Sequence, residues 1–136
     1  MGHRTPAENE QRIVEALRAV TTQGGHGNYL IISVAHAYVQ FLGEQGSDLL
    51  LCEAASNDAL PPERKLSSDK IEALRQLGFQ PPRLLGLFPR KGNYSQFYEV
   101  PTEELLRDLA AHILTAFDEV YDVPPDSDFE LQIHLA

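Results

Sequence analysis

The sequence predicts an α+β fold, in which helices pack on one face of an antiparallel sheet of four to five strands. Three observations support it: helical periodicity near both ends, a run of β-forming segments after the first helix, and a length suited to one core. The chain has 136 residues, of which 43% are hydrophobic, enough for a single buried core. We expect one domain over residues 1–136, with its core at about 6–123 and an acidic tail at 124–136. The predicted element order is α-β-β-β-α-β-α.

The first predicted helix spans about residues 6–22. Thr5 and Glu8 form a capping box, and Pro6 takes the first helical position, where its missing N–H does no harm. Apolar residues recur on one face at helical spacing; they are Ile13, Ala16, Leu17 and Val20. Gly24-Gly25-His26-Gly27 ends the helix. This segment leads from a helix to a strand, the reverse of the order in phosphate-binding loops, so we interpret it as a helix stop.

Three antiparallel strands are predicted next, near residues 28–34, 37–43 and 49–55, because β-branched, aromatic and other apolar residues dominate there. Ala35-His36 is poor turn chemistry, so a single long bent strand over the first two is the alternative. Counting alternate positions groups Tyr29, Ile31, Val39, Phe41, Leu49 and Leu51 on one face, and Leu30, Ile32, Tyr38, Leu42, Leu50 and Cys52 on the other. Both faces would be apolar, and one layer of helices cannot cover both. We therefore expect a partner subunit or a client on the second face.

The second helix is predicted to begin after its cap at Ser67 and to end at Gly78, with Phe79 contacting Leu74 across that end. Pro81-Pro82 prevents its continuation. Residues 83–93 are expected to be irregular, with exposed basic side chains at Arg83, Arg90 and Lys91.

A fourth strand is predicted over residues 94–100, with Tyr94, Gln96 and Tyr98 on one face and Ser95, Phe97 and Glu99 on the other. Thr102 caps a last helix that ends before Pro124-Pro125. Within the tail, apolar residues alternate with polar ones from Phe129 to Leu135. This alternation predicts an edge strand over 126–136, paired either within the subunit or with a neighbouring copy.

The formal charge is −9 and its distribution is uneven: residues 64–91 are basic, whereas the C-terminal third is strongly acidic. A nucleic-acid surface needs clustered Lys and Arg, so we expect no nucleic-acid partner. We expect residues 64–91 to pair with the acidic third instead, within the chain or across a dimer. No apolar run approaches the roughly 20 residues that span a bilayer, and residues 1–10 lack a signal-peptide core. We therefore expect no membrane partner and a cytoplasmic location.

No residue is predicted to be catalytic, to bind a cofactor or to bind a metal. Cys52 lies within an apolar strand without a local cation to activate it, so we interpret it as a core residue. The histidines at 3, 26, 36, 112 and 134 show no ligand spacing, and His112 is expected at the helix surface or the core edge. The acidic run at 126–130 places Leu131 where a calcium loop needs glycine, which excludes that loop.

A set of segments, in order, resembles the bacterial TY-Chap domains, which are similar to YbjN and to type III secretion chaperones. The segments are Tyr38-Val39-Gln40-Phe41, Glu53-Ala54-Ala55-Ser56-Asn57, Leu60-Pro61-Pro62-Glu63, Leu66-Ser67, the run from Leu74 to Pro82, Gly92-Asn93-Tyr94, and Val120-Tyr121-Asp122-Val123-Pro124. The resemblance covers about residues 10–125. Phe79 stands where many relatives have Trp, and the segment from Arg83 to Lys91 matches no family pattern.

This resemblance implies a type III secretion chaperone-like fold and a non-catalytic protein-binding role in a bacterial stress-response or secretion-related system. It implies a protein partner or client and a homodimer, and it assigns no catalytic residues or cofactors. The alternative is a small-molecule-binding domain or an enzyme whose site is assembled only in three dimensions. A deep polar pocket with Cys52 and a histidine would favour the alternative, whereas a shallow apolar groove would favour protein binding.

Overall fold

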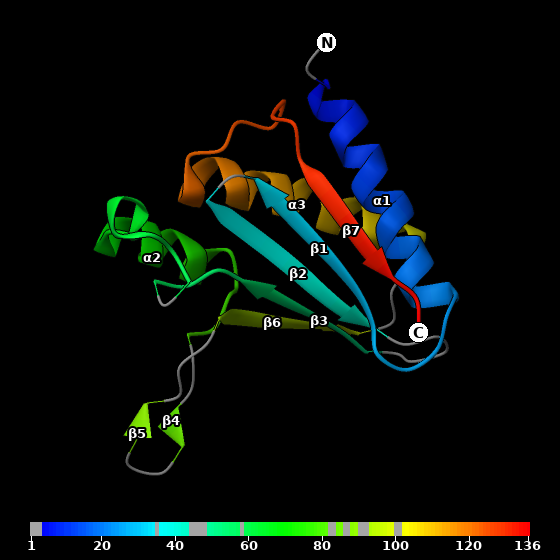
Figure 1. Ribbon diagram of the computed structural model, residues 1–136, viewed down its shortest axis with the longest axis horizontal. Helices are drawn as coiled ribbons and strands as arrows, with labels where there is room; N and C mark the ends of the chain where they lie inside the picture. Colours follow the sequence, from blue (N-terminus) through cyan, green and yellow to red (C-terminus); the bar gives the residue numbers. More distant parts are fainter. Residues whose placement is uncertain are drawn as a thin grey trace.

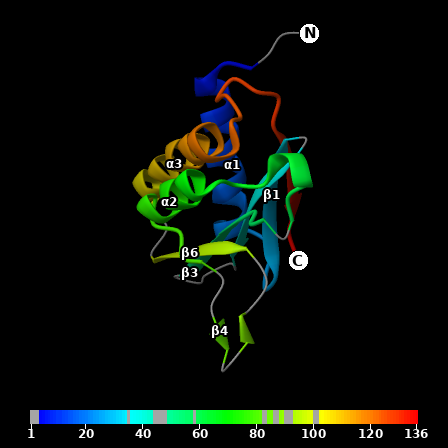
Figure 2. The same cartoon turned by 90° about the vertical axis from the view of Figure 1, so that its left-hand side faces the viewer.

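The computed structural model describes residues 4–34, 36–43, 49–57, 59–81, 84–85, 88–89, 93–99 and 102–136. Its main body is a five-stranded antiparallel sheet with helices on one face only (Figures 1 and 2). The helices are α1 (Pro6–Thr22), α2 (Ser68–Gln76) and α3 (Glu103–Tyr121), with a short 3₁₀ turn η1 at Pro62–Arg64. The sheet strands are β1 (Asn28–Val34), β2 (Ala37–Gly43), β3 (Leu49–Ala54), β6 (Tyr94–Glu99) and β7 (Glu130–His134).

The strands lie in the order β6-β3-β2-β1-β7, and every neighbouring pair is antiparallel. The predicted α+β class and element order are confirmed, with one further strand at the C-terminus. β1 and β2 are separate strands paired from Val34 opposite Ala37 onward, so the alternative of one long bent strand is wrong. α1 packs on α3, and α2 packs on the other side of α3 (Figure 2).

The helix ends follow the predicted capping chemistry. Thr5 Oγ1 accepts a hydrogen bond from the Glu8 N–H at 3.1 Å, and Glu8 Oε1 accepts one from the Thr5 N–H at 3.2 Å. α2 ends with Gly78 at φ +98, where the Phe79 N–H donates to the Leu74 carbonyl at 3.1 Å. Because the left-handed backbone at Gly78 turns the chain sharply, Phe79 enters the core.

The C-terminal tail forms β7 and pairs with β1, with Leu30 opposite Ile133. Phe129, at the start of this segment, is buried, so the core extends beyond residue 123. Two buried asparagines hold the tail in place. Asn9 Nδ2 donates to the carbonyls of Pro125 and Ser127, both at 2.9 Å, and Asn28 Oδ1 accepts from the Ala136 N–H at 2.9 Å. The alternation from Phe129 to Leu135 therefore does mark an edge strand, formed within the chain.

The face that meets the helices, here called the closed face, carries a fully buried row of side chains. These are Leu30, Ile32, Val39, Phe41, Leu50, Cys52 and Ala54. The predicted grouping by alternate residue numbers is wrong for β2 relative to β1. Leu30 lies opposite Phe41 across the hairpin, so even positions of β1 share a face with odd positions of β2.

The segment over residues 83–93, predicted to be irregular, contains two short strands. Leu84–Leu85 (β4) and Phe88–Pro89 (β5) form a two-stranded antiparallel ladder where the sequence predicted irregular chain. It lies away from the five-stranded sheet (Figure 1). Arg83, Arg90 and Lys91 lie outside the described residues.

Candidate functional site

The other face of the sheet, here called the open face, carries none of the three α-helices (Figure 2). The short turn η1 is drawn on this side, beside β1. Register and alternation place on it the side chains of Tyr29, Ile31, Ser33, Tyr38, Gln40, Leu42, Leu49, Leu51, Glu53, Ser95, Phe97, Glu99, Glu130, Gln132 and His134. Seven of these fifteen residues are apolar, and three of the seven, Leu42, Leu49 and Phe97, are exposed. Neighbouring exposed apolar side chains often mark a binding surface, because burial of apolar surface is favourable. The open face is therefore the first candidate for a binding surface.

Four apolar residues form a continuous row across four strands, here called the apolar row: Phe97, Leu51, Leu42 and Tyr29. Each lies directly opposite the next in the strand register. The side chain of Phe97 is 65% exposed and that of Leu42 is 39% exposed. The row ends at Tyr29 on β1. On the edge strand β7, the ring of His134 stacks on that of Tyr29 with centroids 4.9 Å apart, so ring and apolar side chains follow one another across all five strands.

A hollow of about 340 Å³ lies along part of the apolar row. Its lining residues are Gly27, Asn28, Leu42, Gly43, Leu49, Leu51 and Phe97. Leu49, 52% exposed, widens the apolar surface beside the row. This is the shallow apolar groove that favours protein binding over small-molecule chemistry.

The charged groups of the open face are acidic, apart from His134. They are Glu53, Glu99 and Glu130, and none of the fifteen positions is Lys or Arg. Glu53 Oε1 accepts a hydrogen bond from Gln40 Nε2 at 2.7 Å, in the polar row next to the apolar one. Apolar contacts bordered by carboxylates favour a partner with apolar and basic side chains.

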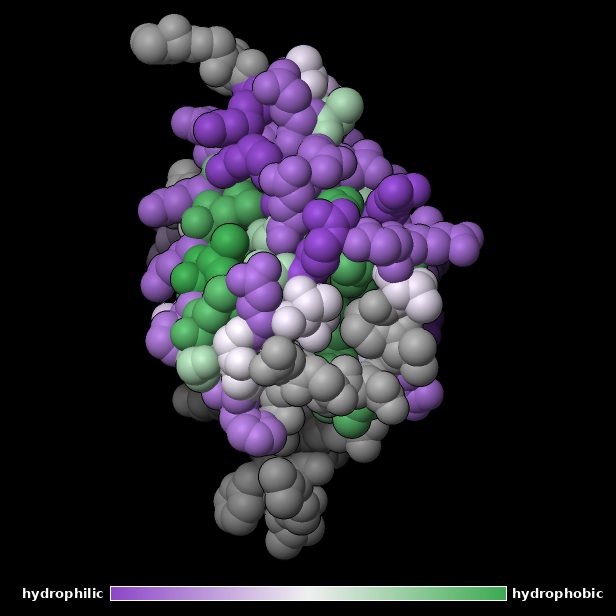
Figure 3. Space-filling view, turned by 90° about the vertical axis from the view of Figure 1, so that its right-hand side faces the viewer, coloured by the Kyte–Doolittle hydropathy of each residue, from purple (hydrophilic) through white to green (hydrophobic). Residues whose placement is uncertain are grey.

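The flank that carries α1 and β7 is mostly hydrophilic, and hydrophobic side chains form a band on the side toward the open face (Figure 3). Ile133 and Leu135 of the tail are exposed at this flank. Apolar exposure on the described surface is thus concentrated on the sheet, not on the helices.

Cys52 lies on the closed face and has no exposed surface, which confirms its predicted place in the core. Burial raises the pKa of its thiol well above the ordinary value, with a smaller contribution from the nearby Glu53 carboxylate. The thiolate is therefore disfavoured, and with it the nucleophilic form of this side chain.

The histidines within the described ranges lie in separate environments. His112, predicted at the core edge, stacks on Phe79 with ring centroids 6.0 Å apart, and its buried Nε2 has no hydrogen-bond partner there. His36 Nε2 lies 3.1 Å from the Tyr121 carbonyl at the end of α3. Across the part of the chain that the structure describes, no group of three or more His, Cys, Asp or Glu side chains could hold a metal ion.

One basic residue of segment 64–91, Lys70, pairs with the acidic C-terminal third as predicted, whereas Arg75 pairs with Glu72 of its own helix. Lys70 Nζ lies 2.9 Å from Asp122 Oδ1 and donates to the Glu119 carbonyl at 2.8 Å. Asp128, in the run predicted as solvated surface, pairs with Arg4 at 2.7 Å. These contacts hold Lys70 on the helix layer and Arg4 near the start of the chain.

An α+β fold with α-helices on one side of an antiparallel sheet is consistent with the chaperone-like fold that the family resemblance implies. A family model described as "T3SS (YopN, CesT) and YbjN peptide-binding chaperone 3" (TY-Chap3) matches residues 7–133. The chain belongs to this family, and the match includes β7, which lay beyond the resemblance noted from the sequence. No curated protein and no solved structure matches the chain. None of the helices in the described ranges has the length and apolar character needed to cross a membrane.

Proposed function

We propose that the chain is a non-catalytic, peptide-binding chaperone-like domain that holds a segment of a client protein on its open face. The observation that carries this proposal is the apolar row, which crosses the sheet without a covering helix. Phe97 and Leu42 would lose much of their exposed surface against a client side chain. Burial of apolar surface would supply most of the binding free energy.

The negative charge of the open face should make binding depend on the charge of the client segment. Glu53, Glu99 and Glu130 border the apolar row without a Lys or Arg on the same face. An acidic client segment would meet like charge, whereas a basic one would gain favourable contacts. We infer that the preferred client segment combines apolar with basic side chains.

A catalytic or small-molecule function gains no support from Cys52, whose thiol is buried and held neutral. The membership of a peptide-binding family supports the proposed non-catalytic role. The proposal includes a cytoplasmic role in a bacterial stress-response or secretion-related system, as the family resemblance implies.

The test is binding of a fluorescent probe peptide that combines leucine and arginine side chains, followed by anisotropy. Leu42→Ser and Phe97→Ser should each weaken binding about tenfold, since truncating a central apolar contact typically costs more than 1 kcal/mol. Ile133→Ser removes an apolar side chain outside the open face whose exposure, 46%, lies between those of Leu42 and Phe97. It is the matched control and should bind like the unmodified protein. Equal affinities for all four proteins, or no binding, would contradict the proposal.

A second copy of the chain is the competing occupant of the open face, as the expected homodimer would require. Sedimentation over a range of protein concentrations detects self-association. A salt series then distinguishes an apolar self-interface, whose affinity varies little with salt, from one held by charge pairs. Self-association that is abolished by Leu42→Ser, without any peptide binding, would assign the face to a dimer and refute the client proposal.

A further inference from the structure

A small cavity, here called the charged cavity, lies where the β1–β2 turn, η1, the start of α2 and the end of α3 meet. Its volume is about 110 Å³, which corresponds to about four water molecules at ~30 Å³ each in the liquid. Its charged or titratable lining residues are His36, Glu63, Arg64, Lys65, Lys70 and Asp122. Basic side chains of the segment 64–91 are thus gathered around one cavity, in a chain whose formal charge is −9.

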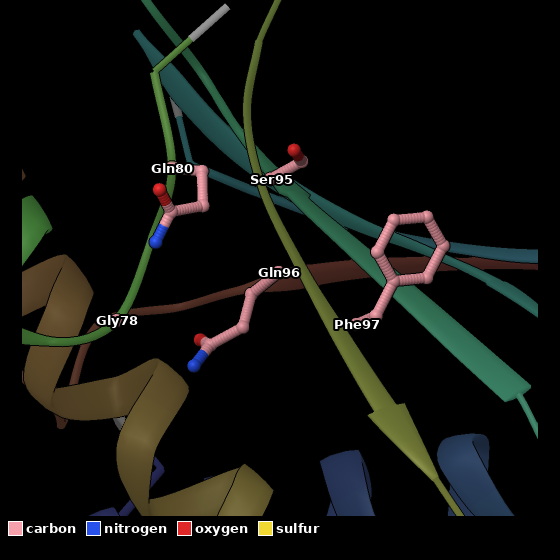
Figure 4. A pocket seen from close by; sticks show the side chains of 5 residues that line it. All are labelled: Gly78, Gln80, Ser95, Gln96 and Phe97. Atoms are coloured by element: carbon pink, nitrogen blue, oxygen red, sulfur yellow. The ribbon is translucent and has the colours of Figure 1, made fainter.

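The larger cavity beside β6 differs in its lining. It has a volume of about 450 Å³ and is lined by Gly78, Gln80, Ser95, Gln96 and Phe97, none of which is charged. Gln80 forms a one-residue bridge to β6 there: its N–H donates to the Ser95 carbonyl at 2.7 Å, and its carbonyl accepts from the Ser95 N–H at 2.9 Å. Figure 4 shows Gln80 and Gln96 between the two segments, with Phe97 on the other side of β6. This lining carries no charge that would attract an ion, whereas that of the charged cavity does.

On one side of the charged cavity, η1 and the residue after it provide two positive charges and one negative charge. Lys65 Nζ donates to the carbonyl of Asn57, which is neutral, so Lys65 keeps its full charge. The guanidinium of Arg64 and the carboxylate of Glu63 form no ion pair with another residue that the structure describes. This side therefore offers a ligand two cations and one free carboxylate.

The end of α3 forms the other side, and its groups already have partners. Lys70 Nζ lies 2.9 Å from Asp122 Oδ1 and donates to the Glu119 carbonyl at 2.8 Å. His36 Nε2 lies 3.1 Å from the Tyr121 carbonyl, and because a carbonyl oxygen only accepts, this nitrogen carries the hydrogen of the bond. Carbonyls at a helix C-terminus carry partial negative charge, but two of them are occupied by donors here. The α3 side therefore opposes a bound anion less than a free helix end would.

We propose that the charged cavity binds inorganic phosphate, with Arg64 and Lys65 contacting its oxygens and Glu63 accepting the hydrogen of its hydroxyl group. A guanidinium group presents N–H donors in a planar fork that fits two oxygens of one phosphate. The volume of the cavity suits a free tetrahedral ion. This inference is independent of the proposed peptide-binding function.

The free carboxylate of Glu63 gives the site a selectivity among oxyanions. A carboxylate only accepts hydrogen bonds, so it repels an anion that has no hydrogen to donate. Hydrogen phosphate keeps an O–H at neutral pH, whereas sulfate has the same shape and keeps none. A phosphate monoester such as methyl phosphate has largely lost its O–H above its second pKa of about 6. We therefore expect orthophosphate to bind more tightly than methyl phosphate or sulfate at pH 7.5.

The test is titration of the full chain with sodium phosphate at pH 7.5 and constant ionic strength, followed by amide chemical shifts in NMR. Phosphate should cause saturable shifts at residues 63–65 and bind about tenfold more tightly than sulfate or methyl phosphate. Arg64→Gln should weaken phosphate binding about tenfold, because it removes a charged donor. Arg107→Gln, which removes an exposed positive charge on α3 outside the cavity, is the matched control and should bind like the unmodified protein.

Glu63→Gln tests the role of the carboxylate. It removes the negative charge at nearly constant size, so the affinity for sulfate should rise toward that for phosphate and the selectivity should disappear. Equal binding of sulfate and phosphate by the unmodified protein, or equal losses in Arg64→Gln and Arg107→Gln, would show only a general attraction of anions and would refute the site. Methyl phosphate that binds as tightly as orthophosphate would assign the cavity to phosphate monoesters and refute free phosphate as its ligand. Shifts that do not saturate would refute binding altogether.

Discussion

The two faces of the sheet are made of the same five strands and carry similar types of apolar residue, yet they differ in burial. Phe41 on the closed face is fully buried, whereas Leu42, the next residue of β2, is exposed on the open face. α1 and α3 cover one face, and none of the three α-helices covers the other (Figure 2). The difference shows that apolar content alone does not define a core. Apolar residues that remain outside the core indicate a binding surface.

The faces also differ in charge. On the helix layer, several acidic groups have basic partners, as in Arg18 with Glu103 and Lys70 with Asp122. On the open face, the glutamates have no Lys or Arg beside them among the strand positions. This difference in pairing is the basis of the proposed preference for a client segment with basic and apolar side chains.

The largest expected effect compares Phe41 with Leu42. Phe41→Ala should lower the free energy of unfolding by about 3–5 kcal/mol, because it leaves a cavity beneath the helices. Leu42→Ala should lower it by less than about 1 kcal/mol, because its side chain packs against little. Urea denaturation followed by circular dichroism measures both. Similar losses at the two positions would show that the side chains of the open face are buried in solution, and would contradict the difference in burial between the two faces.

A smaller effect concerns the thiol of Cys52. Cys52→Ala should cost about 1 kcal/mol of stability, as small core truncations do, and should leave peptide binding unchanged. In the unmodified protein, the thiol should react slowly with an alkylating reagent and rapidly in denaturant, because burial both blocks access and raises its pKa.

Leu42→Cys in the Cys52→Ala background is the matched control for this labelling. It moves the only thiol from the closed face to the open face, where it should react quickly in the native state. Fast native labelling of Cys52 itself would mean that the closed face opens readily and would revive the enzyme alternative.

Local signals in the sequence were sufficient to predict most elements. The capping box at Thr5, the glycine at 78 and the cap at Thr102 each act within one helical turn, so the helix bounds follow from neighbouring residues. The alternation of residues 94–99 gave the faces of β6 correctly, and the tail alternation gave β7. These features do not depend on how distant segments meet.

The candidate site depends on pairing between distant segments, so the sequence predicted an exposed apolar face but not its members. Residue parity grouped Val39 and Phe41 with Tyr29, whereas the β1–β2 register places them on the closed face. Phe97 joins Leu51 and Leu42 only through the order β6-β3-β2. The one-residue bridge at Gln80 is equally non-local, since Pro81-Pro82 indicated only the end of a helix. The number of residues in the β1–β2 turn sets the register of that hairpin, and it is the one local signal from which the faces of β2 could have been predicted.

The smallest expected effect tests the charge difference between the helix layer and the open face. Arg18 donates a hydrogen bond to Glu103, and its charge adds to this contact, so the pKa of the Glu103 carboxyl is lowered, with a further contribution from Arg107. A carboxyl whose pKa is lower in the folded than in the unfolded state stabilises the fold above its unfolded pKa of about 4.3. That contribution is lost as the pH falls through the lower folded value. Glu103→Gln should therefore make the loss of stability below about pH 4.5 less steep, as measured by urea denaturation at a series of pH values. Glu99→Gln removes a carboxylate from the open face without removing an ion pair, and it should preserve the steepness of the unmodified protein. Equal changes in the two variants would mean that the charge difference between the faces does not exist in solution.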